Sequence, residues 1–382
     1  MDAIDIFVFG SAGDYDDLNP YKIFKDKRIQ DIVLTLAKKQ GYTYDLLSLS
    51  NELSIAVGTL DQIVDHLIKA NLIVSKQEKF SLNFPFFIDG DIKIIERFSK
   101  KVVVQIGDVL LKNEEKLKHL LSQYDFKVND VNRLLYHLIG DKTFDGLALD
   151  YFAKKDLFAI SKVQPLGRDY IVVGYEKSEQ VEYFSKKMLC SSNNYFTEDV
   201  IFNSFGDSFG DRKDFYRYFR LVQANPKNID AINKSFNFEF SSFEEKQMSE
   251  LAASILKVLN QEPLTSREFE NLDILRQFDY IELKEDKVIF KVPVISFDCV
   301  KEIANEVLSL IEEEVSTIFS NFEHKLKGLS ALSHQATLKE IGNEMWHQVF
   351  GEINSYLIQE GLFLEPHFTE SEGRYLRALY LK

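Results

Sequence analysis

Residues 53–73 read Leu-Ser-Ile-Ala-Val-Gly-Thr-Leu-Asp-Gln-Ile-Val-Asp-His-Leu-Ile-Lys-Ala-Asn-Leu-Ile, and this stretch decides the fold of the first part of the chain. Leu60, Val64 and Leu67 recur at helical spacing, which predicts a helix that begins near Gly58. Asn71 follows where a residue in the left-handed conformation commonly ends a helix. The stretch therefore predicts an amphipathic helix with a defined end.

The flanking segments add two helices and a hairpin to this pattern. Apolar residues at steps of three and four predict a helix over residues 27–40, and a second helix is expected over 45–53. After the central helix, 72–75 and 79–82 read as two short strands around the polar tip Lys76-Gln77-Glu78. Three helices followed by a hairpin predict a winged helix.

The pattern over residues 27–84 resembles the helix-turn-helix and wing of arsenic-repressor-type and MarR-type bacterial regulators. The resemblance rests on the spacings Leu53-x-Ile55, Thr59-Leu60-x3-Val64-x2-Leu67 and Ala70-Asn71-Leu72-Ile73. It implies a non-enzymatic, DNA-binding protein that resembles a transcriptional regulator. In such proteins the recognition helix and the wing contact duplex DNA. The residues here that suit that contact are Thr59, Gln62, Lys69, Lys76 and Lys79.

Charge favours an alternative use of the same fold. Asp61 and Asp65 lie on the outer face of the central helix, where carboxylates oppose phosphates. The chain of 382 residues has 60 acidic and 46 basic residues, a formal net charge of −14. Such a charge disfavours unspecific binding to nucleic acid. The alternative is a tandem winged-helix scaffold or assembly subunit that acts through protein–protein contacts, in the general layout of the kleisin-binding winged-helix subunits of chromosome-organising complexes.

A second copy of the pattern follows 208 residues later, since 280 − 72 = 208. Aligning 72–87 with 280–295 without a gap matches Ile73 with Ile281, Lys76 with Lys284, Lys79 with Lys287 and Pro85 with Pro293. The second copy is shorter, with 44 residues from Ile29 to Ile73 against 33 from Met248 to Ile281. Its stretch 264–272 is therefore expected to form one helix, which leaves little for a full recognition helix.

These patterns predict a mainly helical α+β protein with internally duplicated winged-helix units. Each unit is expected to add a helical connector and a small α+β lobe. The expected parts are an N-terminal segment (1–25), a first winged helix (26–90), a connector and lobe (91–176), a bridging insertion (177–242), a degenerate second winged helix (243–296), and a long helix with a second lobe (297–382).

The segment 299–327 is the most strongly periodic part of the chain. Apolar residues recur there at steps of three and four, from Val300 to Leu326, beside the acidic run Glu312-Glu313-Glu314. Such a helix suits a protein partner or a homodimer through its apolar seam. The other interpretation is an ordinary helix packed on its own domain, with the acids on its solvated face.

A cluster of basic and aromatic residues at 212–220 offers a second binding surface. Cations together with aromatic rings hold phosphates and stack bases in nucleic-acid-binding proteins. The competing interpretation is an amphipathic helix whose arginines pair with acids, with Phe215 and Phe219 facing inward. The residues of this possible phosphate or partner patch are Arg212, Lys213, Tyr216, Arg217 and Arg220.

No motif in the sequence predicts catalysis, a cofactor or a metal. The phosphate-loop, dinucleotide-binding, zinc-protease and hydrolase motifs are absent from the sequence. Glu344-x-x-His347 occurs once, whereas di-iron bundles need two such motifs. Cys190 and Cys299 are too far apart to predict a zinc site. No apolar run approaches the roughly 20 residues of a membrane span, and the acidic N-terminus is unlike a signal peptide, so a cytoplasmic protein without a membrane partner is expected.

Overall fold

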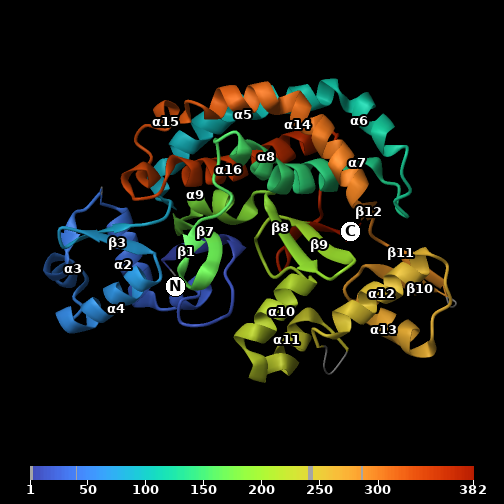
Figure 1. The fold of residues 1–382 in the computed structure, drawn as a ribbon, viewed down its shortest axis with the longest axis horizontal. Helices are drawn as coiled ribbons and strands as arrows, with labels where there is room; N and C mark the ends of the chain where they lie inside the picture. The colour runs from blue at the N-terminus through green and yellow to red at the C-terminus, as the bar shows by residue number, and fades with distance from the viewer. Residues whose placement is uncertain (1–2, 40, 240–243, 285–286) are drawn as a thin grey trace. The chain divides into compact units, whose positions relative to one another are not determined.

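The computed structural model describes residues 3–39, 41–239, 244–284 and 287–382. Helices predominate and the strands are short, which confirms the expected mainly helical α+β class (Figure 1). The chain forms two compact units, each assembled from three separate segments. Unit 1 comprises Met1–Ile106, Leu147–Lys187 and Ile311–Ile353, and unit 2 comprises Gly107–Gly146, Met188–Leu310 and Asn354–Lys382.

The sheet of unit 1 joins the start of the chain to a strand much later in the sequence. β1 (Ile4–Ser11) runs antiparallel to β7 (Arg168–Glu176), and β5 (Phe86–Phe87) runs parallel to β7 on its other side. β6 (Val163–Gln164) pairs with the start of β7. Ile4 lies in the core that the following helices build, and Ile6 and Val8 pack against it. Sheet and helices therefore share one hydrophobic core.

The predicted three helices and hairpin follow β1. Leu60, Val64 and Leu67 are buried and Asn71 takes a φ of 59°, as the sequence predicts. The elements are α1 (Pro20–Ile23), α2 (Lys27–Ala37), β2 (Tyr44–Asp45), α3 (Leu46–Leu53), α4 (Val57–Lys69), β3 (Ile73–Lys76) and β4 (Lys79–Leu82). β2 pairs with β4, so the hairpin belongs to a sheet of order β2-β4-β3.

Helices from three parts of the sequence complete unit 1. Long helices α5, α14 and α16 each begin in one unit and continue into the other, so they contribute residues to both. The helical elements are η1 (Asp89–Asp91), α5 (Ile92–Lys112), α8 (Ala148–Lys154), η3 (Pro165–Gly167), α9 (Glu179–Glu182), η4 (Tyr183–Lys187), α14 (Phe297–Phe319), α15 (Phe322–Lys325), η6 (Ser330–Ser333) and α16 (Leu338–Gln359).

The sheet of unit 2 has the order β12-β14-β9-β8. β14 (Gly373–Leu381) runs antiparallel to β9 (Val200–Gly206) and parallel to β12 (Val294–Ser296). β8 (Ser191–Phe196) adds an antiparallel strand on the far side of β9. β13 (Phe368–Thr369) pairs with the start of β14, as β6 does with β7. The order β12-β14-β9 repeats the order β5-β7-β1 of unit 1, with the same strand directions.

The remaining elements of unit 2 surround this sheet and a second hydrophobic core. Val200 and Phe202 of β9 lie in that core together with Met248, Leu251 and Ile255. The elements are α6 (Glu114–Leu121), α7 (Val131–Leu135), the π-helix η2 (Tyr136–Leu147), α10 (Phe215–Ala224), η5 (Pro226–Asn228), α11 (Ile229–Phe236), α12 (Gln247–Leu259), α13 (Ser266–Gln277), β10 (Ile281–Lys284) and β11 (Lys287–Phe290).

Backbone hydrogen bonds recur at matching places in the two units. They close the end of α4 or α13, tie the second hairpin strand back to the first, and attach the following strand to the sheet. The bonds are Leu72 N to Leu67 O and Tyr280 N to Leu275 O (both 2.9 Å), Asn83 N to Leu72 O and Lys291 N to Tyr280 O (both 3.0 Å), and Gly174 N to Pro85 O and Leu379 N to Pro293 O (both 2.9 Å).

The shortening of the second helical block falls on a different helix from the one expected. α13 spans Ser266–Gln277 and occupies the position of α4 at the 208-residue spacing, so this helix is nearly full length. The segment 260–265 instead connects α12 directly to α13, with no counterpart of α3 between them. The expectation that little remains for a full-length helix here is therefore wrong, because the shorter spacing falls between α12 and α13, where no further helix lies.

Residues 177–242, expected to form a bridging insertion, contain integral parts of unit 2. β9 is a central strand of its sheet, and Gly206 lies opposite Tyr375 as Gly10 lies opposite Tyr170 in unit 1. Sequence reasoning missed this match, although Phe9-Gly10 and Phe205-Gly206 recur just before a turn.

The apolar seam of the predicted long helix is already covered within the chain. Val300, Ala304, Val307, Ile311, Val315, Ile318, Phe322 and Leu326 are all buried. A homodimer through 299–327 would need this seam exposed, so that expectation is wrong. The other interpretation, an ordinary helix packed within its own chain, fits α14 and α15.

We predict that Gly206→Ala destabilises unit 2 by about 1–3 kcal/mol, because a new Cβ overpacks the sheet. That Cβ would lie 1.9 Å from the carbonyl oxygen of Arg374 and 2.6 Å from Cα of Tyr375, both backbone atoms of β14. Urea unfolding measures the change. Gly146→Ala, where an added Cβ meets nothing within 4 Å, is the control in the same unit. Equal stability of the two variants would contradict the close pairing of β9 with β14.

Candidate functional site

The turn between α3 and α4 is held by side-chain hydrogen bonds at both ends of α3. Asp45 caps the helix by accepting from the Ser48 backbone N–H (2.8 Å), while the Ser48 hydroxyl accepts from the Asp45 N–H (3.0 Å). At the other end Ser54 takes a φ of 52°, and the Ser50 hydroxyl donates to the carbonyl of Ile55 (2.6 Å). These bonds set where α4 begins and which of its side chains face outward.

The outward face of α4 carries both the predicted contact residues and the two aspartates. Thr59, Gln62 and Lys69 are exposed, as the helical spacing implies. Asp61 and Asp65 are exposed as well. A phosphate backbone lying along this face would meet two carboxylates, Asp61 and Asp65, and one lysine, Lys69.

The wing presents two lysines on either side of a tight turn. Lys76 and Lys79 are exposed and lie opposite each other in the hairpin of β3 and β4. The turn residues Gln77 and Glu78 have φ values of 52° and 61°, and two positive φ angles define a type I′ turn. The predicted contact residues of the wing are therefore available to a partner.

A hollow of about 330 Å³ lies beside α4 within unit 1. Thr59, Gln62 and His66 line it from α4. Its basic residues are already paired, because Lys22 contacts Asp17 at 2.8 Å and Arg28 contacts Asp26 at 2.5 Å. The hollow therefore adds no net positive charge to the surface of α4.

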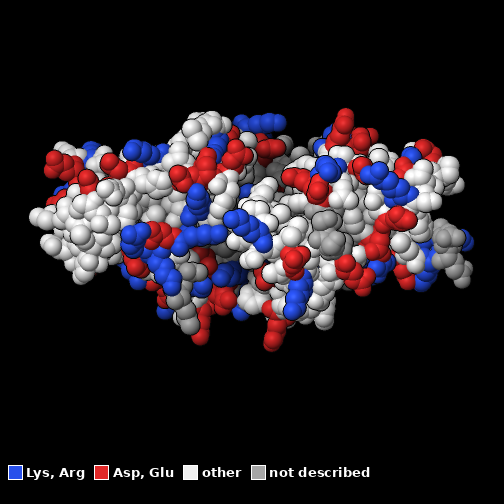
Figure 2. Space-filling model, turned by 90° about the horizontal axis from the view of Figure 1, so that it is seen from below, with Lys and Arg blue, Asp and Glu red and all other residues white. Residues whose placement is uncertain are grey.

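The surface formed by α3 and the start of α4 carries little charge, which sequence reasoning did not single out. Glu52 is the one charged residue in the stretch 46–60. Leu47 of α3 is 63% exposed, and Val57 at the start of α4 is 41% exposed. Figure 2 shows a broad area without charged side chains at its left end, where α2, α3 and α4 lie in Figure 1. The sparse charge of 46–60 was the signal in the sequence.

Arg212 is not a surface residue, so its predicted place in a phosphate-binding patch is wrong. Its side chain is 1% exposed and its guanidinium donates to the carbonyl oxygens of Ser204 (3.2 Å), Asp207 (2.8 Å from Nε) and Ser191 (3.1 Å). Burial lowers the pKa of this guanidinium from its usual value. Arg212 therefore acts as a buried cross-link between the turn after β9 and the strands of the sheet.

The other members of that cluster engage neighbours rather than form an open basic surface. Lys213 contacts Glu372 at 3.3 Å, Arg217 contacts Asp211 at 2.6 Å, and Arg220 donates to the hydroxyl of Tyr216 at 3.3 Å. Phe215 and Phe219 face the core of unit 2, as the competing interpretation expects. An amphipathic helix on which Arg217 pairs with an acid therefore describes α10 better than a phosphate site does.

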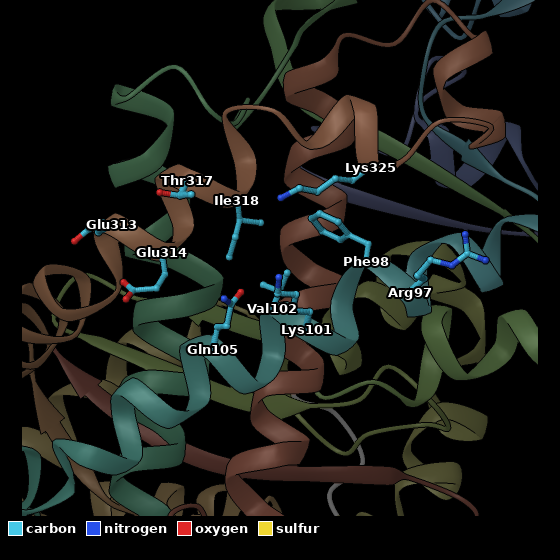
Figure 3. Close-up of a pocket in the computed structure, with 10 residues that line it drawn as sticks. All are labelled: Arg97, Phe98, Lys101, Val102, Gln105, Glu313, Glu314, Thr317, Ile318 and Lys325. Carbon is cyan, nitrogen blue, oxygen red and sulfur yellow. The ribbon is translucent and has the colours of Figure 1, made fainter.

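A larger hollow, of about 580 Å³, lies in unit 1 between α5 and the end of α14 (Figure 3). Phe98, Val102 and Ile318 give it an apolar floor, and Lys325 reaches in from the α15 side. Arg97, Lys101, Glu313 and Glu314 mix both signs of charge around its rim. This mixture points to no particular ligand.

The Glu344-x-x-His347 pair on α16 is buried in unit 1. Tyr175 of β7 donates to Oε1 of Glu344, and the side-chain amide of Gln348 donates to the same oxygen (2.6 Å). Oε2 of Glu344 has no hydrogen-bond partner, and burial raises the pKa of this carboxyl group. His347 stacks on Phe9 with ring centroids 4.3 Å apart. The cluster is a packed polar network.

The described residues contain no group of three or more His, Cys, Asp and Glu side chains placed to hold a metal ion. Within the same ranges, none of the helices combines the length and the apolar character needed to cross a bilayer. Comparison of the chain with protein-family models, with curated proteins and with solved structures found no match. The site is therefore interpreted from its own geometry.

We predict that Glu344→Gln stabilises the protein near pH 8 by about 1–3 kcal/mol, because a neutral amide replaces a carboxyl group whose charged form is disfavoured by burial. A carboxyl whose pKa is raised by folding favours the folded state below its unfolded pKa, near 4.5, and this contribution is lost as pH rises through the folded pKa. The variant should therefore flatten the fall in stability above pH 4.5, measured as Tm against pH.

The exposed Glu323→Gln provides the matched control, and its Tm should follow the wild-type pH profile. A Glu344→Gln profile that falls as steeply as the wild-type profile would show that Glu344 does not carry the pH dependence.

Proposed function

We propose that the chain contains two diverged copies of a winged-helix unit and that it is a non-enzymatic binding protein. Support for the duplication comes from the recurring hydrogen bonds around Pro85 and Pro293 and from the matching strand orders β5-β7-β1 and β12-β14-β9. The hairpins β3–β4 and β10–β11 keep the 208-residue spacing. Among the residues that the structure describes, unit 2 has no helix that corresponds to α3, so we propose that unit 1 carries the helix-turn-helix surface and unit 2 does not.

We further propose that the protein is a scaffold or assembly subunit that binds another protein through α3 and α4. The observation that carries this proposal is the exposed surface formed at 46–60, where Glu52 is the single charged residue and Leu47 and Val57 point to solvent. Exposed apolar side chains surrounded by neutral residues favour a protein surface over a phosphate backbone. Asp61 and Asp65, next along α4, further disfavour DNA.

We predict that the double variant Leu47→Glu, Val57→Glu loses its protein partner, because two carboxylates would be buried unpaired in the interface. The measurement is quantitative pull-down from the source cells with identification of the bound proteins, with an expected loss of at least about tenfold. Val163→Glu, at an 80% exposed valine elsewhere in unit 1, is the matched control and should retain the partner.

If the double variant retains every protein that the wild type binds, α3 and α4 are not the interface. Circular dichroism and the unfolding midpoint show whether the variant is still folded. The side chains of Leu47 and Val57 point to solvent, so the circular dichroism spectrum and the unfolding midpoint of the variant should stay close to those of the wild type.

DNA binding by unit 1 is the second candidate function, and the exposed wing lysines favour it. We predict that Lys76→Glu, Lys79→Glu weakens binding to random-sequence duplex DNA and reduces the slope of log K against log salt by about 2, one for each lost phosphate contact. Fluorescence anisotropy at several salt concentrations measures both effects.

The matched control changes the equivalent lysines of the second hairpin, Lys284→Glu and Lys287→Glu. It makes the same change in net charge, so equal effects of the two double variants would indicate general repulsion rather than a wing contact. A wild-type protein that ignores duplex DNA at low salt would eliminate this candidate.

A further inference from the structure

In unit 2 the outer edge of β9 is occupied by a further strand. Lys382 N donates to Asp199 O (2.9 Å), which marks one hydrogen-bonded pair of the antiparallel ladder between β9 and β14. Such pairs alternate along a ladder, so every second residue of β9 directs its N–H and C=O away from β14. These residues are Val200, Phe202, Ser204 and Gly206. β8 covers them, and Thr197 N donates to Val200 O (3.0 Å).

In unit 1 the backbone groups of β1 that point away from β7 have no partner strand among the described residues. Lys177 N donates to Ala3 O (2.9 Å), in the place of the Lys382 to Asp199 bond, and Gly174 directs its N–H to Pro85 on the other side of β7. The outward residues of β1 are therefore Ile4, Ile6, Val8 and Gly10. In the described ranges no strand pairs with this edge.

This open edge has few of the devices that usually protect an edge strand, because Asp5 is the single charged residue of β1. β1 is eight residues long and has neither proline nor lysine. Its Ile6, Phe7, Val8 and Phe9 are partly exposed, so apolar side chains flank the unpaired backbone on both faces of the sheet. Long apolar edges of this kind favour the addition of another strand.

We propose that β1 pairs antiparallel with β1 of a second copy of this chain, with the two-fold axis at Phe7. In this register Ile4 lies opposite Gly10 and Ile6 opposite Val8, so all outward-facing residues meet one another. The four resulting pairs, each exchanging two backbone hydrogen bonds, satisfy the whole edge. A register shifted by one residue would set outward groups against inward ones and form none of these bonds.

The side chains also suit this self-pairing. Ile6 and Val8 already pack against the core of unit 1, so placing them side by side extends an apolar surface. Asp5, which contacts Lys186 at 3.1 Å, would lie opposite Phe9 rather than opposite the second Asp5. This register therefore avoids facing like charges. The surface is separate from α3 and α4, so the inference does not rest on the function proposed above.

Analytical ultracentrifugation of the full chain over the micromolar range tests the proposal, with a concentration-dependent dimer as the expected result. Val8→Pro removes a backbone N–H that points away from β7, which an edge strand tolerates. The change occurs twice in the dimer and should raise the dimer Kd roughly tenfold or more. Val8→Thr keeps the N–H and should dimerise like the wild type.

Cysteine cross-linking tests the register and does not depend on the proline variant folding. In a Cys190→Ser background, Phe7→Cys places two thiols at a non-hydrogen-bonded pair on the axis, where Cα atoms lie about 4.5 Å apart and mild oxidation closes a disulfide. Phe9→Cys is the matched control and should stay monomeric on a denaturing gel, because it faces Asp5.

Three results would overturn the proposal. They are a wild-type chain that stays monomeric throughout, a Phe9→Cys variant that cross-links as well as Phe7→Cys, and a segment of a different protein found on the β1 edge.

Discussion

Each unit depends on one backbone contact. In unit 1 the short strand β5, which follows a proline, pairs with β7, and in unit 2 the short strand β12, which also follows a proline, pairs with β14. Gly174 donates to the Pro85 carbonyl, and Leu379 donates to the Pro293 carbonyl. Proline lacks an N–H and accepts through its carbonyl alone, so it suits the first position of a strand that pairs on one side. The bond ties the helices and hairpin that precede the proline to a strand from a distant part of the sequence.

This attachment is the same in both units, but the elements around it differ. Unit 1 has α3 between α2 and α4, and with it the surface of low charge that includes Leu47 and Val57. Unit 2 has no counterpart of α3 in its described residues, but it has β8 on the edge that unit 1 leaves open. The surface of α3 and α4 proposed to bind a partner and the open edge of β1 therefore both belong to unit 1.

Burial explains why charged residues that resemble sites in the sequence are structural in the fold. Arg212 donates to several main-chain carbonyls of unit 2, a use that suits a guanidinium with its several donors in a fixed plane. Glu344 lies in unit 1 beneath Tyr175 and Gln348, and burial raises the pKa of its carboxyl group. In the sequence both residues are candidates for ligand binding, but in the structure both side chains are buried.

The sequence by itself determined the local elements. The spacing of Leu60, Val64 and Leu67, the stop at Asn71 and the polar tip between β3 and β4 are short-range features, and all of them appear as predicted. Tertiary structure decided which distant segments share a sheet, that no helix lies between α12 and α13, and that Arg212 and the α14 seam are buried. Periodicity reports which face of an element is apolar, whereas strand pairing and side-chain burial depend on contacts between residues far apart in the chain.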